Sequence, residues 1–348
     1  SSDLHGRSGD KGDSANVGVI ARSDAAYDWL RGHLGAAQEV AFAPDSARVV
    51  TVGQSDRTVR VWDVLSGRLL VSREFDSPVQ ALAFALAAFL GLRLFIVGLT
   101  FVLMLRGRGE IAPELHLGPL AALRMMLEEY LAMILLFAVI QPFESIWMRP
   151  DRLTRPAPGR LPLLLIHGYQ CNRAFWFWQR PLLEAAGWVV ATHSLEPVYS
   201  DIDVYAEGIS RRIDEVLSAT NAPKLILIGH SMGGLASRAY LRRHGVAKVA
   251  RLITLGSPHQ GTLLASLGLG PNARQMRIGS PWLRALAAPL PAGSVSIYSC
   301  HDNYVYPQQA CSMLNGAANV AIGGVSHLGM AFSPVVRASL LQTLESEI

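Results

Sequence analysis

The sequence predicts an α/β fold for the second half of the chain, with a mostly parallel sheet flanked by helices. Apolar runs of strand length, such as 161–166 and 224–228, alternate with helix-like segments, which is typical of buried parallel strands. The run 224–228 leads through a glycine-containing turn, 229–233, into a helix-like run, 235–244. We expect a membrane-helix region and a small, partly β N-terminal remnant to precede this fold.

The turn at 229–233 reads Gly-His-Ser-Met-Gly, a G-x-S-x-G pattern. Between a strand and a helix this pattern is typical of a nucleophile elbow. Its glycines permit a tight turn that a Cβ would block, and the turn lifts the serine hydroxyl out of the sheet. An ordinary structural turn is the alternative. We predict that Ser231 is a catalytic nucleophile.

A serine nucleophile needs a base, and the base needs an orienting acid. After an elbow of this kind the acid precedes the histidine in the chain. No Asp or Glu lies between Met232 and His301, and Asp302 is the only one before Glu345. After Asp302 the only histidine is His327. The order therefore predicts the triad Ser231, Asp302 and His327.

The local settings of the acid and the histidine agree with this triad. Asp302 follows the strand-like run 295–299, and His327 lies in a loop after the strand-like run 319–322. Both are expected at the carboxyl edge of the sheet, where α/β proteins place their sites. Taken singly, Asp302 would be read as a turn-capping aspartate and His327 as a hydrogen-bonded core histidine.

An acyl-transfer site also needs two N–H donors for the oxyanion. One should be the backbone N–H of Met232, directly after the nucleophile. We assign the other to the backbone N–H of Tyr169, which follows the strand 161–166 and the pair His167-Gly168. The alternative for that pair is an ordinary strand-to-loop turn.

Three separated motifs resemble the bacterial triacylglycerol lipase branch of the α/β-hydrolases. They are Leu-Ile-His-Gly at 165–168, Gly-His-Ser-Met-Gly-Gly at 229–234 and Thr-Leu-Gly-Ser-Pro-His-Gln-Gly-Thr at 254–262. The resemblance covers roughly residue 150 to the C-terminus. It implies hydrolysis of esters, with lipid acyl esters as the expected substrates, through an acyl-serine intermediate and without a cofactor. The calcium site of some secreted members has no match here, so we predict no metal.

The expected substrate side is apolar. Phe175 and Trp176 follow the oxyanion loop, and Leu263 and Leu267 lie in an insertion before Asp302. We predict that these four residues bind substrate, with the insertion as a lid or acyl-pocket wall. A packed helix pair is the alternative for the insertion, and at least some of the adjacent aromatic residues should pack on the core.

Cys300 and Cys311 bracket Asp302. A disulfide between them would hold the acid in place and would require an oxidising compartment. Cys171 would then be unpaired. The alternative for each of the three cysteines is a free buried thiol.

An apolar run, 81–105, is long enough to span a bilayer, with Arg93 as its only charge. The shorter run 131–140 is a second span, an interfacial helix or a buried helix. Basic residues flank both runs, so the positive-inside rule does not fix an orientation. The span 232–301 carries basic residues and no acid, which indicates a solvated basic face or attraction to an anionic membrane. We expect membrane association, with the catalytic domain on the extracytoplasmic side, in the periplasm of a bacterium.

The front of the chain resembles two family fragments. Residues 1–35 resemble part of an acyclic-terpene-utilisation protein, through the Gly/Asp/Ser-rich segment 6–16. Residues 37–85 resemble a single WD40 repeat, in which Trp62-Asp63 ends a strand. One propeller blade cannot bury its faces alone, so we interpret the front as a fused remnant or artificial join, with strands at about 40–72 that are poorly ordered or form a small subdomain.

These observations predict a division of the chain into four segments. The segments are an N-terminal remnant (1–78), a membrane-associated helical region (79–141), a linker (142–160) and a catalytic domain (161–348). The predicted function is that of a serine esterase or lipase. The alternatives are a thioesterase, acyltransferase or amidase with the same triad, and a membrane-tethered interaction protein that uses the WD-like front. We expect no nucleic acid partner, and the sequence fixes no oligomeric state.

Overall fold

The computed structural model describes residues 39–42, 48–52, 58–63, 69–74, 78–109 and 111–346. The chain divides into two compact units, 1–94 and 95–348. The segment that resembles a terpene-utilisation protein, 1–35, lies outside the described residues.

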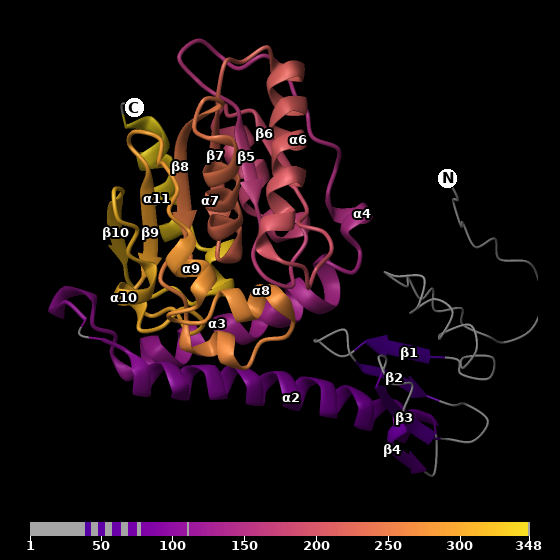
Figure 1. Cartoon of the computed structure of the whole chain (residues 1–348). Helices are drawn as coiled ribbons and strands as arrows, with labels where there is room; N and C mark the ends of the chain where they lie inside the picture. The colour runs from indigo at the N-terminus through magenta and orange to yellow at the C-terminus, as the bar shows by residue number, and fades with distance from the viewer. Residues whose placement is uncertain are drawn as a thin grey trace, which may run out of the picture. The chain divides into compact units, whose positions relative to one another are not determined.

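The first unit contains a four-stranded antiparallel sheet in chain order (Figure 1). Its strands are β1 (Glu39–Phe42), β2 (Arg48–Val52), β3 (Thr58–Asp63) and β4 (Leu69–Glu74). The strands expected at about 40–72 are therefore present as one meander. The apolar helix α2 (Pro78–Gly107) begins in this unit and ends in the second.

The second unit is built on a six-stranded sheet of order β10-β9-β8-β7-β5-β6 in which every pair of neighbours is parallel. The strands are β5 (Leu163–Ile166), β6 (Val190–His193), β7 (Leu225–His230), β8 (Val249–Leu255), β9 (Val295–Ser299) and β10 (Ala318–Ile322). The predicted α/β class with a parallel sheet is confirmed. All six carboxyl ends meet at one edge because the strands are parallel.

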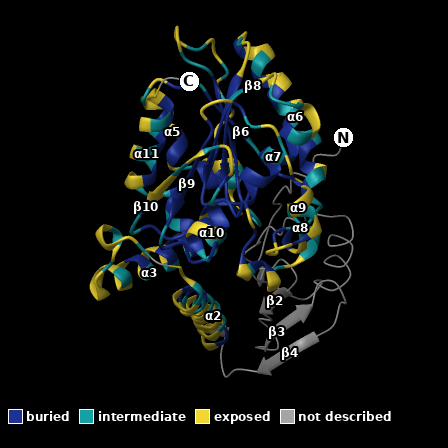
Figure 2. Ribbon diagram, turned by 60° about the vertical axis from the view of Figure 1, so that its left-hand side comes forward, coloured by how far each residue is buried: buried dark blue, intermediate teal, exposed yellow. Residues whose placement is uncertain are grey.

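Helices cover both faces of this sheet (Figure 2). Leu163 and Leu165 of β5 pack into the same core cluster as Leu183 of α5 (Gln179–Ala185) and Leu340 of α11 (Pro334–Glu345). Leu164 and Ile166 face the opposite way, toward α6 (Ile202–Thr220) and α7 (Met232–His244). Alternate residues of a fully buried strand thus feed two cores, which is why β5 reads as an unbroken apolar run.

Five further helices of the second unit complete the described fold. They are α3 (Pro119–Ile134), α4 (Glu144–Trp147), α8 (Gly270–Gln275), α9 (Pro281–Ala285) and α10 (Gln308–Ser312). A π-helical stretch, Leu135–Ile140, continues α3, and 3-10 turns lie at Pro113–Leu115, Arg173–Trp176, Leu263–Ser266 and Leu328–Ala331.

In the second unit, α2 buries one face and exposes the other. Val97, Phe101 and Met104 are buried in the same core cluster as Met125 and Met133 of α3. Large apolar side chains remain exposed on the rest of this part of α2, namely Phe95, Leu99, Val102 and Leu105. Among the described residues, Val79–Gly107 is the one helix long and apolar enough to cross a membrane.

The second apolar run, 131–140, is a helix with one face in the core. Ala132, Met133, Leu136 and Ile140 are buried there, and Leu131 is exposed. Leu135 and Val139 are exposed as well, so this helix is buried on one face only and its relation to a membrane stays a prediction.

The segment expected as a linker, 142–160, makes specific contacts with the six-stranded sheet and its helices. Asp151 is 3% exposed, accepts a hydrogen bond from the backbone N–H of Thr192 at 2.8 Å, and forms ion pairs with Arg173, Arg180 and Arg212. Its boundaries stay a prediction.

Candidate active site

Ser231 lies at the turn between β7 and α7 with a strained backbone. Its φ of 53° and ψ of −124° place it in a region that non-glycine residues rarely adopt. A Cβ on Gly233 would lie 2.5 Å from the carbonyl oxygens of Ile166 and His167. A Cβ on Gly229 would meet the backbone of Gly234 at 2.6 Å. The glycines of the motif therefore allow α7 to pack directly against the end of β5.

The loop after β5 lies against Ser231. A Cβ on Gly168 would lie 2.9 Å from Cβ of Ser231, so the loop backbone lies against the serine side chain. Buried His167 fixes this loop, because its Nδ1 donates to the carbonyl of Gly168 and its Nε2 accepts from the N–H of Leu195, each at 2.8 Å.

The two predicted oxyanion donors lie on either side of this contact. The N–H of Met232 opens α7, and first-turn N–H groups have no acceptor within a helix. Tyr169 follows Gly168, and its hydroxyl donates to the carbonyl of Leu269 at 2.7 Å and accepts from the N–H of Leu269 at 2.9 Å. These bonds hold the Tyr169 loop against the insertion that contains Leu269. The oxyanion roles stay a prediction.

Asp302 and His327 meet at the carboxyl ends of β9 and β10. Nδ1 of His327 donates to Oδ2 of Asp302 at 2.8 Å, and both side chains are buried. The other oxygen, Oδ1, accepts from the N–H groups of Tyr304 and Val305 at 2.8 Å each. Both side-chain oxygens of Asp302 thus accept hydrogen bonds, and the bond from Nδ1 directs Nε2 of His327 away from the acid.

Opposing effects set the pKa of His327. Burial alone would lower it, but the charge and the hydrogen bond of Asp302, with the charge of Glu129, raise the pKa of His327 above its ordinary value of 6.5. The Tyr304 ring stacks on the imidazole with centroids 5.0 Å apart. Tyr304 therefore limits rotation of the His327 imidazole by covering one of its faces, and Asp302 holds its Nδ1 edge.

His230 directly precedes Ser231 in the chain, and its side chain contacts His327. Its ring centroid lies 4.7 Å from that of His327, and its Nε2 lies 3.3 Å from the carbonyl oxygen of His327. No hydrogen bond joins Ser231 to His327 within the described part of the chain, and catalytic hydrogen bonds are often long without substrate. The three residues follow the carboxyl ends of β7, β9 and β10. Their action as a complete triad stays a prediction.

The four predicted substrate residues lie in two settings. Phe175 is buried and stacks on His230 with centroids 4.2 Å apart, and Trp176 is buried behind Phe175. Leu263 and Leu267 are exposed on the insertion. Phe175 and Trp176 therefore support the nucleophile turn from the core, and contact of any of the four with substrate stays a prediction.

The cysteines near the acid are thiols in this structure. Cys171, Cys300 and Cys311 are all unbridged, so the expected Cys300–Cys311 disulfide is not formed here. Burial, with the nearby charge of Asp302, raises the pKa of Cys311 to about 12. A bridge under oxidising conditions stays a prediction.

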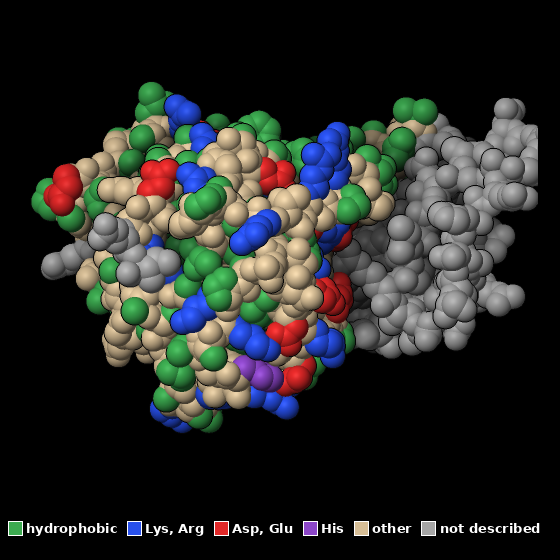
Figure 3. All heavy atoms as spheres, turned by 90° about the horizontal axis from the view of Figure 1, so that it is seen from above, with side chains coloured by type: hydrophobic (Ala, Val, Ile, Leu, Met, Phe, Trp, Pro, Cys, Tyr) green, Lys and Arg blue, Asp and Glu red, His purple; other side chains and the backbone are tan. Residues whose placement is uncertain are grey.

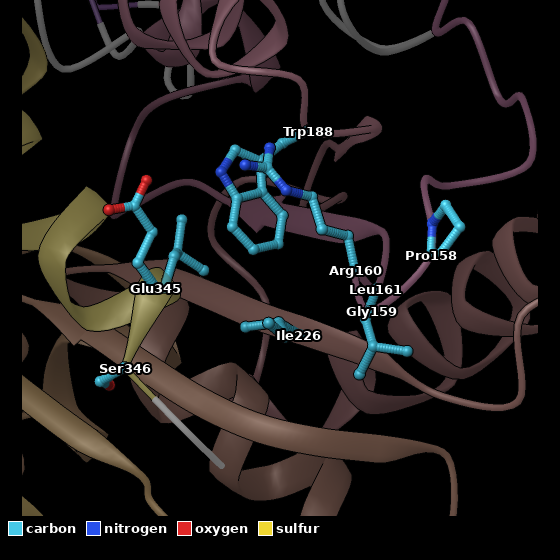
Figure 4. A pocket seen from close by; sticks show the side chains of 9 residues that line it. Pro158, Gly159, Arg160, Leu161, Trp188, Ile226, Glu345 and Ser346 are labelled. Atoms are coloured by element: carbon cyan, nitrogen blue, oxygen red, sulfur yellow. The ribbon is translucent and has the colours of Figure 1, made fainter.

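The described residues contain no metal-ligand cluster, and one cavity lies away from the predicted site. Among the described residues, no three His, Cys, Asp or Glu side chains gather as metal ligands would. A cavity of about 390 Å³ lies at the opposite edge of the sheet, where Arg160, Leu161 and Trp188 precede strands β5 and β6 (Figure 4). The Arg160 guanidinium lies 4.7 Å from the Trp188 ring centroid in its wall, and the wall contains neither Ser231 nor His327.

Sequence reasoning missed one buried acid beside this site. Glu129 of α3 is fully buried and contacts the loop of His327. The available signal is its position on α3. Glu129 shares one helix face with the buried residues Met125 (four before it), Ala132 (three after) and Met133 (four after), which indicates a buried position.

Comparison with known proteins shows which families the second unit resembles. Residues 162–285 match the family model of the alpha/beta hydrolase fold. Triacylglycerol lipases of Pseudarthrobacter phenanthrenivorans and Burkholderia plantarii are each 34% identical to the chain over 117 residues, which is 31% of this chain and 36% and 32% of theirs. The chain thus matches about a third of the length of these relatives.

A solved structure shows the same fold. The lipase BlEst2 of Bacillus licheniformis, in its propeptide form, superposes with a TM-score of 0.50 at 19% identity, over 57% of this chain and 53% of that one. Residues 162–285 thus resemble the alpha/beta hydrolase family within an α/β fold, and the resemblance to bacterial triacylglycerol lipases expected from the three motifs is confirmed.

Proposed function

We propose that the protein is a serine hydrolase that cleaves carboxylic esters, with lipid acyl esters as its substrates. The observation that carries this proposal is the buried Asp302–His327 hydrogen bond at the same sheet edge as the strained Ser231. The similarity to triacylglycerol lipases supports ester substrates.

In the proposed mechanism, Ser231 Oγ attacks the ester carbonyl while Nε2 of His327 takes its proton. Asp302 keeps the Nδ1 proton of His327 in place and stabilises the imidazolium. The N–H groups of Tyr169 and Met232 bind the developing oxyanion. His327 then protonates the departing alcohol, which leaves an acyl group on Ser231. Water attacks that acyl-enzyme with His327 again as base, which releases the acid and restores the serine.

Covalent labelling with a fluorophosphonate, mapped to its residue, tests this proposal. Wild-type protein should be modified at Ser231 and should hydrolyse p-nitrophenyl esters. Ser231→Ala should lose both properties and remain folded by circular dichroism. Ser218→Ala, an exposed serine on α6, is the matched control and should keep both. Ester turnover by Ser231→Ala would refute the assignment. A panel of acyl chain lengths, thioesters and amides separates a lipase from a thioesterase or amidase.

We further propose that α2 associates with a membrane, with the catalytic domain on the extracytoplasmic side. The exposed apolar side chains of α2 support lipid contact. The basic span 232–301 gives little support, because Arg242 and Arg243 of α7 pair with Asp203 and Glu207 of α6. On the face in Figure 3, Lys and Arg side chains lie among Asp and Glu.

Alkaline carbonate extraction tests the membrane association. Wild-type protein should stay with the membrane pellet, whereas a variant with Leu99→Gln and Val102→Gln should be released into the supernatant. Protease protection in spheroplasts tests the side. Release of the wild-type protein by carbonate would contradict insertion of α2.

A further inference from the structure

A second buried carboxylate, Glu129, supports the loop that carries His327. Oε2 of Glu129 accepts hydrogen bonds from the N–H groups of Leu328 and Gly329, at 3.0 and 3.1 Å. Its Oε1 accepts from Nδ2 of Asn303 at 3.3 Å. Leu328 and Gly329 directly follow His327, so this carboxylate holds the start of the 3-10 turn that the histidine precedes.

Burial of a carboxylate is costly unless hydrogen bonds compensate it. Glu129 has no exposed surface and lies on the apolar face of α3. These three contacts are all with donors, as an ionised carboxylate requires. Burial raises the pKa of Glu129, and the charge of His327 with the hydrogen bonds from the loop partly offsets that rise.

Asn303 extends the same network to His327 and to α2. Its Oδ1 accepts from the backbone N–H of His327 at 3.1 Å. Its Nδ2 also donates to the hydroxyl of Thr100 at 2.9 Å. Thr100, Glu129 and Asn303 are all buried. The backbone of His327 is therefore held by groups from α2 and α3 as well as by the catalytic-acid loop.

We propose that Glu129 is a positioning residue for His327, which fixes the histidine loop and places a second negative charge near the imidazole. This inference rests on the proposed function, because it assigns Glu129 a role through the proposed base. The helical region before the hydrolase sheet thereby contributes to the active site.

Few charges face His327. Asp302 contacts its Nδ1, and Glu129 approaches from α3. Burial lowers the pKa of His230 well below its ordinary value, as does the charge of His327, so His230 stays neutral. Tyr304 stacks on the ring. A neutral side chain at 129 should therefore lower the pKa of His327 and move the acid limb of kcat/KM to lower pH.

The test compares Glu129→Gln with Glu128→Gln in the full chain. Glu128 is the neighbouring carboxylate on α3, 50% exposed and paired with Arg124. Glu129→Gln should lower kcat by about 10- to 100-fold with little change in KM, and should shift the acid limb down by about one pH unit. Glu128→Gln should match wild type in both. An unmoved acid limb in folded Glu129→Gln protein overturns the proposal.

Two further measurements keep the result interpretable. If Glu129→Gln does not fold, Glu129→Asp is used, which retains the charge but withdraws it from the loop. It should lower kcat and leave the acid limb in place, and an unchanged kcat overturns the proposal. Fluorophosphonate labelling of wild-type Ser231 is the reference. If it fails, the proposed function and this inference fall together, whereas labelled enzyme with an unmoved acid limb in Glu129→Gln refutes only the role of Glu129.

Discussion

Nδ1 of His327 donates a hydrogen bond to Oδ2 of Asp302 at 2.8 Å, and Oδ1 of the same carboxylate accepts hydrogen bonds from two backbone N–H groups. The acid is thus fixed before it meets the histidine. Because Nδ1 carries the proton, Nε2 is left as the basic nitrogen. In the proposed mechanism this arrangement leaves His327 free to accept the serine proton at Nε2 and makes its role depend on Asp302.

Asp302→Asn should reduce kcat by about 10⁴-fold, as expected when a triad histidine loses its orienting acid and adopts the wrong tautomer. The amide is nearly isosteric, so the fold should persist. The rate of labelling by a fluorophosphonate and the steady-state kcat for a p-nitrophenyl ester measure the loss. Circular dichroism monitors the fold. Activity within tenfold of wild type would remove Asp302 from the mechanism.

The pH dependence of wild-type kcat/KM should show an acid limb centred above pH 6.5. The pKa of His327 is raised above that ordinary value, and a general base must be neutral to act. A raised pKa keeps the base protonated to higher pH, so activity falls as the pH decreases through a value above 6.5. The measurement is kcat/KM for a p-nitrophenyl ester against pH at constant ionic strength. A midpoint at or below 6.5 contradicts this prediction.

The order of the site along the chain was predictable from elementary constraints. Parallel strands share one carboxyl edge, so residues that follow β7, β9 and β10 come to the same side of the sheet. Between Met232 and Glu345, Asp302 is the only acid, and after it His327 is the only histidine. The strand-like runs 295–299 and 319–322 correspond to β9 (Val295–Ser299) and β10 (Ala318–Ile322).

Other features depend on contacts that sequence periodicity does not encode. Glu129 lies about 200 positions before Gly329, its hydrogen-bond donor, and local patterns cannot specify such a pairing. Phe175 and Trp176 read equally as pocket or core residues because both settings are apolar. The structure buries them behind His230. Asp151 looked like part of a linker because its neighbours are proline and arginine, yet its partners come from distant helices.

Gly233→Ala should destabilise the second unit by about 3 kcal/mol, because the added methyl would contact backbone oxygens that cannot move without shifting β5. Gly109→Ala is the control, since no atom lies within 4 Å of a Cβ built there. Urea unfolding of both variants in detergent, followed by tryptophan fluorescence, gives the comparison. Equal midpoints for Gly233→Ala and Gly109→Ala would show that the elbow tolerates a side chain.

Asp151→Asn should be a second strongly destabilising change. Asp151 lies 2.9 Å from Arg180, 2.5 Å from Arg212 and 3.5 Å from Arg173, so its removal leaves three guanidinium groups facing one another. Loss of one partner from a buried ion pair costs about 3–5 kcal/mol. Glu215→Gln removes a 62% exposed partner of Arg212 and should cost under about 1 kcal/mol. Thermal unfolding at low and high salt measures the loss of stability in both variants. If Asp151→Asn loses no more stability than Glu215→Gln, the segment 142–160 is held by its other contacts.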